Sequence, residues 1–227
     1  MFQIEFEEES QVLFLDEIRT AKKLVSLKKR IYITIGILLF GILMGTFSKY
    51  LDYRHAELPQ LFQIIDYTLD FHNFLGGFAP WIVIAVCISI YSYTPFRATI
   101  NVFSFFVGMV ASYYVYSNFV AGFFPKSYAM IWIGFTIVSP ILAYICWYAK
   151  GKGVIALILS ACVISVLINT AFAYGIFYIS ISSWLNVLML ILGIVILYKS
   201  PKETILMICI GIILAILVET FIPFHIW

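Results

Sequence analysis

The sequence predicts an all-α integral membrane protein with seven transmembrane helices, and two observations support this. Of the 227 residues, 63% are hydrophobic and only 11% are charged, whereas about 25% are charged in soluble domains. The apolar residues also form uncharged stretches close to the roughly 20 residues that cross ~30 Å of hydrocarbon. The predicted spans are residues 31–49, 74–93, 98–122, 128–148, 154–173, 182–198 and 204–222.

The basic residues predict the orientation. Eleven of the fourteen fall on one side of these spans: Arg19, Lys22, Lys23, Lys28, Lys29, Arg30, Arg97, Lys150, Lys152, Lys199 and Lys202. By the positive-inside rule, this side is cytoplasmic, which places the N-terminus inside and the C-terminus outside. The chain is then the span 31–49 followed by three hairpins with short basic cytoplasmic turns, and a six-span interpretation would break this sorting.

Residues 1–30 form a charged segment before the domain of residues 31–227. The segment has no small-residue cleavage site, so we expect the first span to be retained. Ser10 can cap an amphipathic helix that is acidic at its start and basic at its end. Two interpretations remain open: a helix lying on the lipid headgroups of the bilayer, or a docking segment for a protein partner.

The external loop 50–73 is predicted to contain a second amphipathic helix. Pro59 can start it, and apolar residues then recur with helical spacing at Leu58, Leu61, Phe62, Ile65 and Leu69. Gln60, Gln63, Asp66 and Asp70 face the other way, so a helix lying on the outer surface is expected.

Two predicted spans contain helix-breaking residues. Gly76, Gly77 and Pro80 lie in the outer turns of span 74–93, and Pro140 lies in the middle of span 128–148. Such residues free backbone carbonyls, which membranes tolerate only where protein or water satisfies them. Broken helices often mark transport sites, although proline kinks also occur without a transport role.

The four spans that run outward carry small residues four apart, followed by a polar residue. The sets are Gly41, Gly45 and Lys49; Gly108, Ser112 and Tyr116; Ala161, Ser165 and Asn169; and Gly211, Ala215 and Glu219, with Asn101 extending the second set inward. Small residues let helix backbones approach closely. The pattern therefore predicts either a common bundle of these four helices, with their polar residues at similar depth, or a chance alignment.

Glu219 is the only acidic residue inside a predicted span. Intramembrane carboxylates are costly and usually face a cavity or a partner. One interpretation places Glu219 in the headgroup region or pairs it with Lys49. The other places it in an outward-facing pocket with Asn169 and Tyr116, where it binds a cation or a proton.

The sequence contains no pattern typical of a catalytic, metal-binding or nucleic-acid-binding site. No catalytic motif is present, so no enzyme activity, catalytic residue or cofactor is predicted. The histidines have no metal-ligand spacing, and the four cysteines all lie in spans, so no metal site is expected. The basic residues are interpreted as membrane anchors, which gives a nucleic-acid role no support.

Three short segments carry a family resemblance. These are Pro80-Trp81, the basic turn at Arg97, and the segment from Gly108 to Tyr114. Together they resemble a family of small multi-spanning bacterial membrane proteins without an assigned function. The resemblance covers about a quarter of the chain and implies a multi-pass protein of the bacterial cytoplasmic membrane.

Two functions are compatible with these features. The first is a small transporter or channel-like protein, with an outward-facing polar pocket between the outward-running helices that binds a small solute or cation. The second is a non-catalytic membrane subunit that docks a protein partner, through residues 1–30 or through a stripe of small residues.

Overall fold

The computed structural model describes residues 15–21, 25–175 and 177–221, and about 82% of the structure is helical. Seven apolar helices occupy the predicted regions: α2 (Leu27–Arg54), α5 (Ala79–Tyr91), α6 (Pro95–Phe119), α7 (Lys126–Tyr148), α8 (Gly153–Ala171), α9 (Trp184–Leu197) and α10 (Pro201–Phe221). Five helices of the described part are long and apolar enough to cross a membrane. The other two, α5 and α9, contain 13 and 14 residues.

Span 74–93 is not one continuous helix, as the sequence analysis assumed. A short helix α4 (Phe71–Gly76) ends where Gly77 adopts an extended conformation, and α5 starts two residues later. Pro80 is the second residue of α5, where its missing N–H costs no helical hydrogen bond. The break therefore follows from Gly76, Gly77 and Pro80, which the sequence analysis had identified as irregular.

The loop between α2 and α4 contains the predicted amphipathic helix, but its buried face is the polar one. A 3₁₀ turn, η1 (His55–Glu57), leads into α3 (Gln60–Leu69), which follows Pro59. Asp66 is buried, whereas Leu61, Phe62 and Ile65 are exposed. The expectation that Asp66 lies on a solvated face is therefore wrong. The reversed orientation suits a helix whose apolar face meets lipid.

The connection between α8 and α9, which joins the predicted spans 154–173 and 182–198, is a β-hairpin. Strands β1 (Phe172–Gly175) and β2 (Tyr178–Ile181) pair antiparallel, with Phe172 opposite Ile181. Aromatic and β-branched residues favour strands. The described structure is therefore all-α except for this one two-stranded sheet.

The small-residue stripes lie at helix contacts, but they join the helices in pairs. A Cβ added to Gly41 would overlap the carbonyl oxygen of Phe105, and one added to Gly108 would approach Leu38. The backbones of α2 and α6 are therefore in close contact. In the second pair, Gly211 of α10 faces Ile164 and Ala161 of α8.

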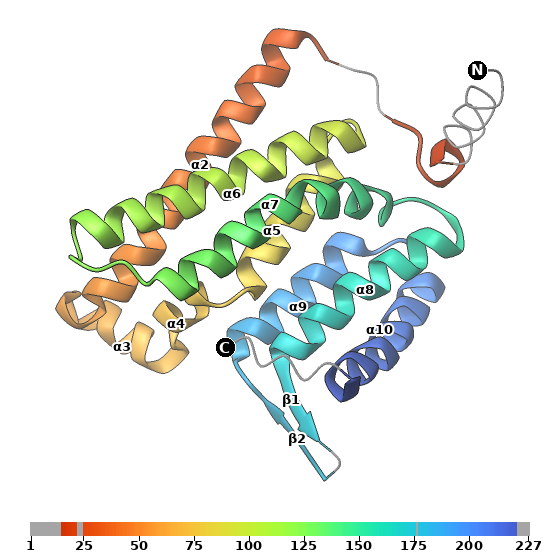
Figure 1. The fold of residues 1–227 in the computed structure, drawn as a ribbon. Helices are drawn as coiled ribbons and strands as arrows, with labels where there is room; N and C mark the ends of the chain where they lie inside the picture. The colour runs from red at the N-terminus through yellow and green to blue at the C-terminus, as the bar shows by residue number, and fades with distance from the viewer. Residues whose placement is uncertain (1–14, 22–24, 176, 222–227) are drawn as a thin grey trace.

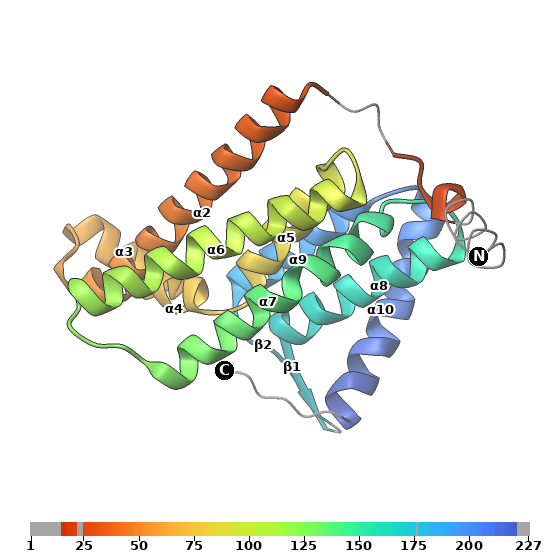
Figure 2. The same ribbon diagram turned by 45° about the horizontal axis from the view of Figure 1, so that its top comes forward.

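The two pairs do not merge into the predicted common bundle. Helices α5 and α7 pack on α6, and they meet α9 and α8 on their other side. Figures 1 and 2 show α2 with α6 at one side of the molecule and α8 with α10 at the other. The stripes are compatible with both arrangements, because a stripe of small residues permits close approach without specifying which helix approaches.

The bundle has two distinct ends (Figure 1). We call the end that carries α3, α4 and the hairpin the open end, and the end that carries residues 15–21 the capped end. At the capped end, Arg19 donates to the backbone oxygens of Ile90, at 2.7 Å, and Trp147, and its guanidinium lies 4.1 Å from the centre of the Trp147 ring. These carbonyls belong to the last turns of α5 and α7, which have no partner within their own helices.

Two further contacts close the capped end. Ile18 is buried, and its carbonyl oxygen accepts a 2.8 Å hydrogen bond from the N–H of Lys152, at the start of α8. The ammonium of Lys150 donates to the backbone oxygens of Ile196 and Tyr198, at the end of α9, both at 2.6 Å. Basic residues interpreted as headgroup anchors therefore also cap helix ends.

Candidate functional site

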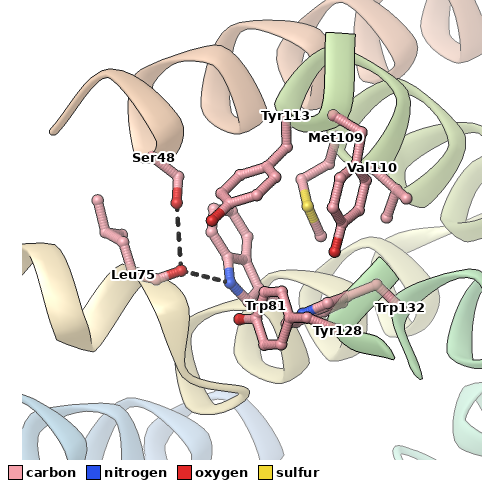
Figure 3. Close-up of a pocket in the computed structure, with 9 residues that line it drawn as sticks. Ser48, Leu75, Trp81, Met109, Val110, Tyr113, Tyr128 and Trp132 are labelled. Atoms are coloured by element: carbon pink, nitrogen blue, oxygen red, sulfur yellow. Dashed lines mark hydrogen bonds between the residues drawn. The ribbon is translucent and has the colours of Figure 1, made fainter. Parts of the chain in front are cut away.

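The break between α4 and α5 frees backbone carbonyls, and neutral side chains from three helices satisfy them. The Leu75 oxygen accepts hydrogen bonds from Trp81 Nε1 at 3.0 Å and Ser48 Oγ at 3.3 Å. The Gly76 oxygen accepts one from the Tyr128 hydroxyl at 2.6 Å. Figure 3 shows Trp81 and Ser48 converging on Leu75. The break is thus held by α2, α5 and α7 together.

A cavity of about 800 Å³ lies beside this break at the open end, and we call it the vestibule. One wall comes from α2, α4, α6 and α7, and the opposite wall from α8 and the start of α9. Its polar lining residues are Ser48, Asp52, Asp70, His72, Asn73, Tyr113, Tyr128, Thr170, Ser182, Ser183 and Asn186. A space of this size, lined by side chains from both halves of the chain, can take a small solute.

Acidic groups dominate the charge of the vestibule. Asp52 and Asp70 line it together with His72, and no lysine or arginine is among its lining residues in the part of the chain that the structure describes. The Asp52 side chain is 42% exposed, while its ion-pair partner Lys49 is only 2% exposed. The pair therefore presents its carboxylate to the vestibule and keeps its ammonium beneath the surface.

Aromatic rings surround the buried ammonium. Lys49 Nζ lies 4.5 Å from the ring centre of Phe123 and 5.3 Å from that of Tyr113. The Tyr113 hydroxyl lies 3.5 Å from the same Asp52 oxygen that Lys49 contacts. Ring faces attract cations at such distances, so this part of the open end is already built to hold an ammonium group.

A second acidic group is secured beside the vestibule. Asp66 accepts hydrogen bonds from the backbone N–H of His72 at 2.9 Å and contacts His72 Nδ1 at 2.8 Å. The His72 ring stacks on His55 with 4.4 Å between ring centres. This network connects α3 to α4 and fixes His72 at the vestibule wall. No group of three potential ligands with metal-site geometry occurs among the residues described.

The five polar residues on the outward-running spans that were considered for ligand binding do not share a pocket in the described structure: Lys49, Asn101, Tyr116, Asn169 and Glu219. Lys49 lies beneath Asp52, and the half-buried Tyr116 does not line the vestibule. Asn101 lies toward the capped end, where it bonds Thr34 and Ser92 at 2.8 and 3.1 Å. The predicted pocket between the outward-running helices is replaced by the vestibule, because those helices associate in two separate pairs.

Asn169 and Glu219 lie together near the hairpin. The amide of Asn169 donates to the Ala215 oxygen at 3.3 Å and accepts from the Tyr174 hydroxyl. Burial raises the pKa of Tyr174, and the nearby Glu219 charge raises it further. Lys49 pairs with Asp52, so the interpretation in which it pairs with Glu219 is wrong.

Of the residues that line the vestibule, Asp70, Gly76 and Gly77 were visible as features of the sequence, but not as parts of a polar cavity. No sequence pattern indicated a binding role for Asp52, His72, Tyr113 or Tyr128. The spacing of Lys49 and Asp52, three residues apart on one helix, was available as evidence of an ion pair. It indicates a local pair but not that the pair borders a cavity.

Comparisons with known proteins give no family assignment. No protein-family model, curated protein or solved structure matches this chain. The resemblance carried by Pro80-Trp81, Arg97 and the segment from Gly108 to Tyr114 stays a prediction. A functional assignment therefore starts from the chemistry of the vestibule.

Proposed function

We propose that the protein is a transporter or channel-like protein of the bacterial cytoplasmic membrane that binds a small cationic solute in the vestibule. In this proposal the seven apolar helices all cross the bilayer, with the N-terminus inside. The open end then faces outward. The observation that carries the proposal is the exposed carboxylate of Asp52 in a solute-sized cavity whose lining contains no lysine or arginine in the described structure.

Three features support binding of a cation in particular. The Asp52 carboxylate is exposed to the vestibule while its own partner Lys49 is buried. Asp70 adds a second carboxylate, and its side chain is 61% exposed. The helix break lies beside the vestibule, and broken helices with irregular backbone are a recurrent way to build ion and solute sites in membrane proteins.

The two ends of the bundle suggest how passage is controlled. Solute enters at the open end, while contacts from residues 15–21 close the other end by joining α5, α7 and the start of α8. Movement of α8, α9 and α10 against the preceding helices would close the vestibule and loosen the contact between Ile18 and Lys152. This is a rocking motion of the kind common in secondary transporters.

The alternative is an accessory subunit that docks a partner through residues 1–30. Residues 15–21 contact the protein's own helices and bury Ile18 there. A partner would therefore have to displace this segment or bind elsewhere in residues 1–30. This observation favours an intramolecular role for residues 15–21.

The test is a thermal-shift screen of the full chain in lipid nanodiscs, using alkali, ammonium, amine and guanidinium chlorides. We expect a saturable cation-dependent stabilisation that weakens at least tenfold in Asp52→Asn and persists in Glu57→Gln. Glu57 is a matched control because it is an exposed acid, paired with Arg54, that does not line the vestibule. Glu219→Gln should behave as wild type.

Loss of the Asp52 charge leaves Lys49 buried without its partner, which can destabilise the fold. The double variant Lys49→Met/Asp52→Asn removes both charges together and separates this effect from binding. No cation response in the wild type, or an unchanged response in a folded Asp52 variant, would overturn the proposal.

A further inference from the structure

We propose that the vestibule opens into a small aromatic chamber that receives a primary ammonium group, so that the solute is a small primary amine or ammonium itself. This inference rests on the proposed function and names the substrate class of the same site. The chamber is a cavity of about 10 Å³ behind the helix break, and it shares Ser48, Tyr113 and Tyr128 with the vestibule. Solute in the vestibule is thus adjacent to the chamber.

The walls of the chamber are mostly aromatic. Nine residues line it: Ser48, Leu75, Trp81, Met109, Val110, Tyr113, Tyr114, Tyr128 and Trp132. Figure 3 shows the rings of Trp81, Tyr113, Tyr128 and Trp132 around one space next to Leu75. Aromatic faces attract cations. Lys49 Nζ already lies 5.3 Å from the centre of the Tyr113 ring, whereas the rings of Trp81, Tyr128 and Trp132 have no cation over them in the described structure.

A buried hydroxyl inside the chamber lacks a partner. Tyr114 is only 8% exposed, and its hydroxyl makes no hydrogen bond to any residue that the structure describes. A buried polar group without a partner is costly, so this position is suited to a ligand that forms a hydrogen bond. The Tyr128 hydroxyl already donates to Gly76, and with the Trp132 indole N–H as a neighbouring donor it keeps one lone pair for a ligand. Two phenolic oxygens can therefore accept N–H bonds from one ammonium group.

The size of the chamber sets the selectivity. A space of about 10 Å³ holds roughly one water-sized group. An –NH₃⁺ group is of this size, whereas each methyl group added to the nitrogen enlarges the head and removes a donor. Asp52 at the mouth contacts Tyr113 and supplies the opposite charge. The chamber therefore accepts primary ammonium groups and rejects quaternary ones.

The experiment compares methylammonium with tetramethylammonium, using titration calorimetry on the full chain in nanodiscs. We expect methylammonium to bind at least tenfold more tightly, and Tyr114→Phe to weaken methylammonium about tenfold while leaving tetramethylammonium unchanged. Tyr114→Phe removes only an oxygen without a protein partner, so the fold should be retained. Tyr91→Phe is the control, because Tyr91 is exposed and lies outside the chamber.

The outcomes separate this inference from the proposed function. If both cations bind equally and still require Asp52, the vestibule binds cations but the chamber does not select them, and the inference is wrong. If Tyr114→Phe leaves methylammonium affinity unchanged, a water molecule alone is the partner of the Tyr114 hydroxyl and the inference again fails. If neither cation binds the wild type, the proposed function fails as well.

Discussion

Both ends of the bundle contain helix carbonyls that lack a partner within their own helix. The two ends differ in the charge of the side chains that donate hydrogen bonds to these carbonyls. At the capped end, Arg19 and Lys150 donate from charged groups to the last carbonyls of α5, α7 and α9. At the open end, Ser48, Trp81 and Tyr128 donate from neutral groups to the carbonyls of the broken helix. Neutral donors also act at the capped end, where Trp147 donates to the Ser92 oxygen at 2.9 Å, so the difference is that charged donors are added at the capped end and are missing at the broken helix.

The difference shows how capping determines what space remains. A guanidinium reaches two helices at once and fills the region between them, so the helices it caps are also joined. Neutral donors satisfy single carbonyls without bringing a charge, so an adjoining acidic cavity can attract a cation from outside. Under the proposed function, closure at one end and access at the other would follow from the choice of capping residue.

The largest expected effect comes from filling the contact between α2 and α6, which positions Ser48 and Asp52 at the open end. A Cβ on Gly45 would overlap the Met109 carbonyl oxygen. We expect Gly45→Leu to reduce the free energy of unfolding by about 3 kcal/mol, the upper range for overpacking, and to abolish the cation response. Thermal unfolding in detergent measures the first effect.

Gly36→Leu is the matched control, since a Cβ there has open space. Equal stability of the two variants would contradict the close packing of α2 on α6.

A smaller effect is expected at the capped end. Arg19→Ala removes two charge-assisted hydrogen bonds and the contact with the Trp147 ring. The expected loss in the free energy of unfolding is about 2 kcal/mol, because hydrogen bonds to charged groups contribute about 1.5–3 kcal/mol. Denaturant unfolding measures it. Thr20→Ala changes an exposed neighbour and should have no effect, and Arg19→Lys should fall between the two because an ammonium lacks the planar fork. A wild-type stability for Arg19→Ala would show that the cap is dispensable.

A neutral capping side chain should contribute less to the free energy of unfolding than Arg19 does. Tyr128→Phe leaves the Gly76 oxygen without its 2.6 Å hydrogen bond, and we expect a loss of about 1 kcal/mol, typical of one neutral hydrogen bond. The same unfolding measurement applies, with Tyr91→Phe as the exposed control. A loss as large as that of Arg19→Ala would remove the distinction drawn between the two ends.

The smallest effect concerns pH. Burial, with a smaller contribution from Arg19, lowers the pKa of Lys150 below its ordinary value of 10.5. Between the lowered pKa and 10.5 the unfolded chain binds more protons at this residue than the folded chain, so stability rises as pH increases through this window. We expect a slight increase in the free energy of unfolding toward pH 10.5 that is missing in Lys150→Met. A decrease specific to the wild type would contradict the direction.

The sequence located the helices well because the length of an apolar stretch is a local property. Span 98–122 corresponds to α6 from Pro95 to Phe119, and the glycines that break span 74–93 were visible beforehand. The donors to the freed carbonyls could not be identified from the sequence, because Ser48, Trp81 and Tyr128 meet only after three helices have packed. The vestibule likewise joins Asp52 to Asn186 across the two halves of the chain. No local pattern indicates which distant residues will meet. The stripes of small residues were equally compatible with helix pairs other than those observed.

The shortness of α5 and α9 affects the electrostatic barrier beside the vestibule. At 1.5 Å per residue, helices of 13 and 14 residues extend about 20 Å, roughly 10 Å less than the usual hydrocarbon thickness. The two helices are neighbours, and a bilayer tends to thin around short helices. Under the proposed function, the low-dielectric layer that a cation would cross is thinnest where these two helices meet. That is the place where the self-energy of a charge between the two aqueous phases would be lowest.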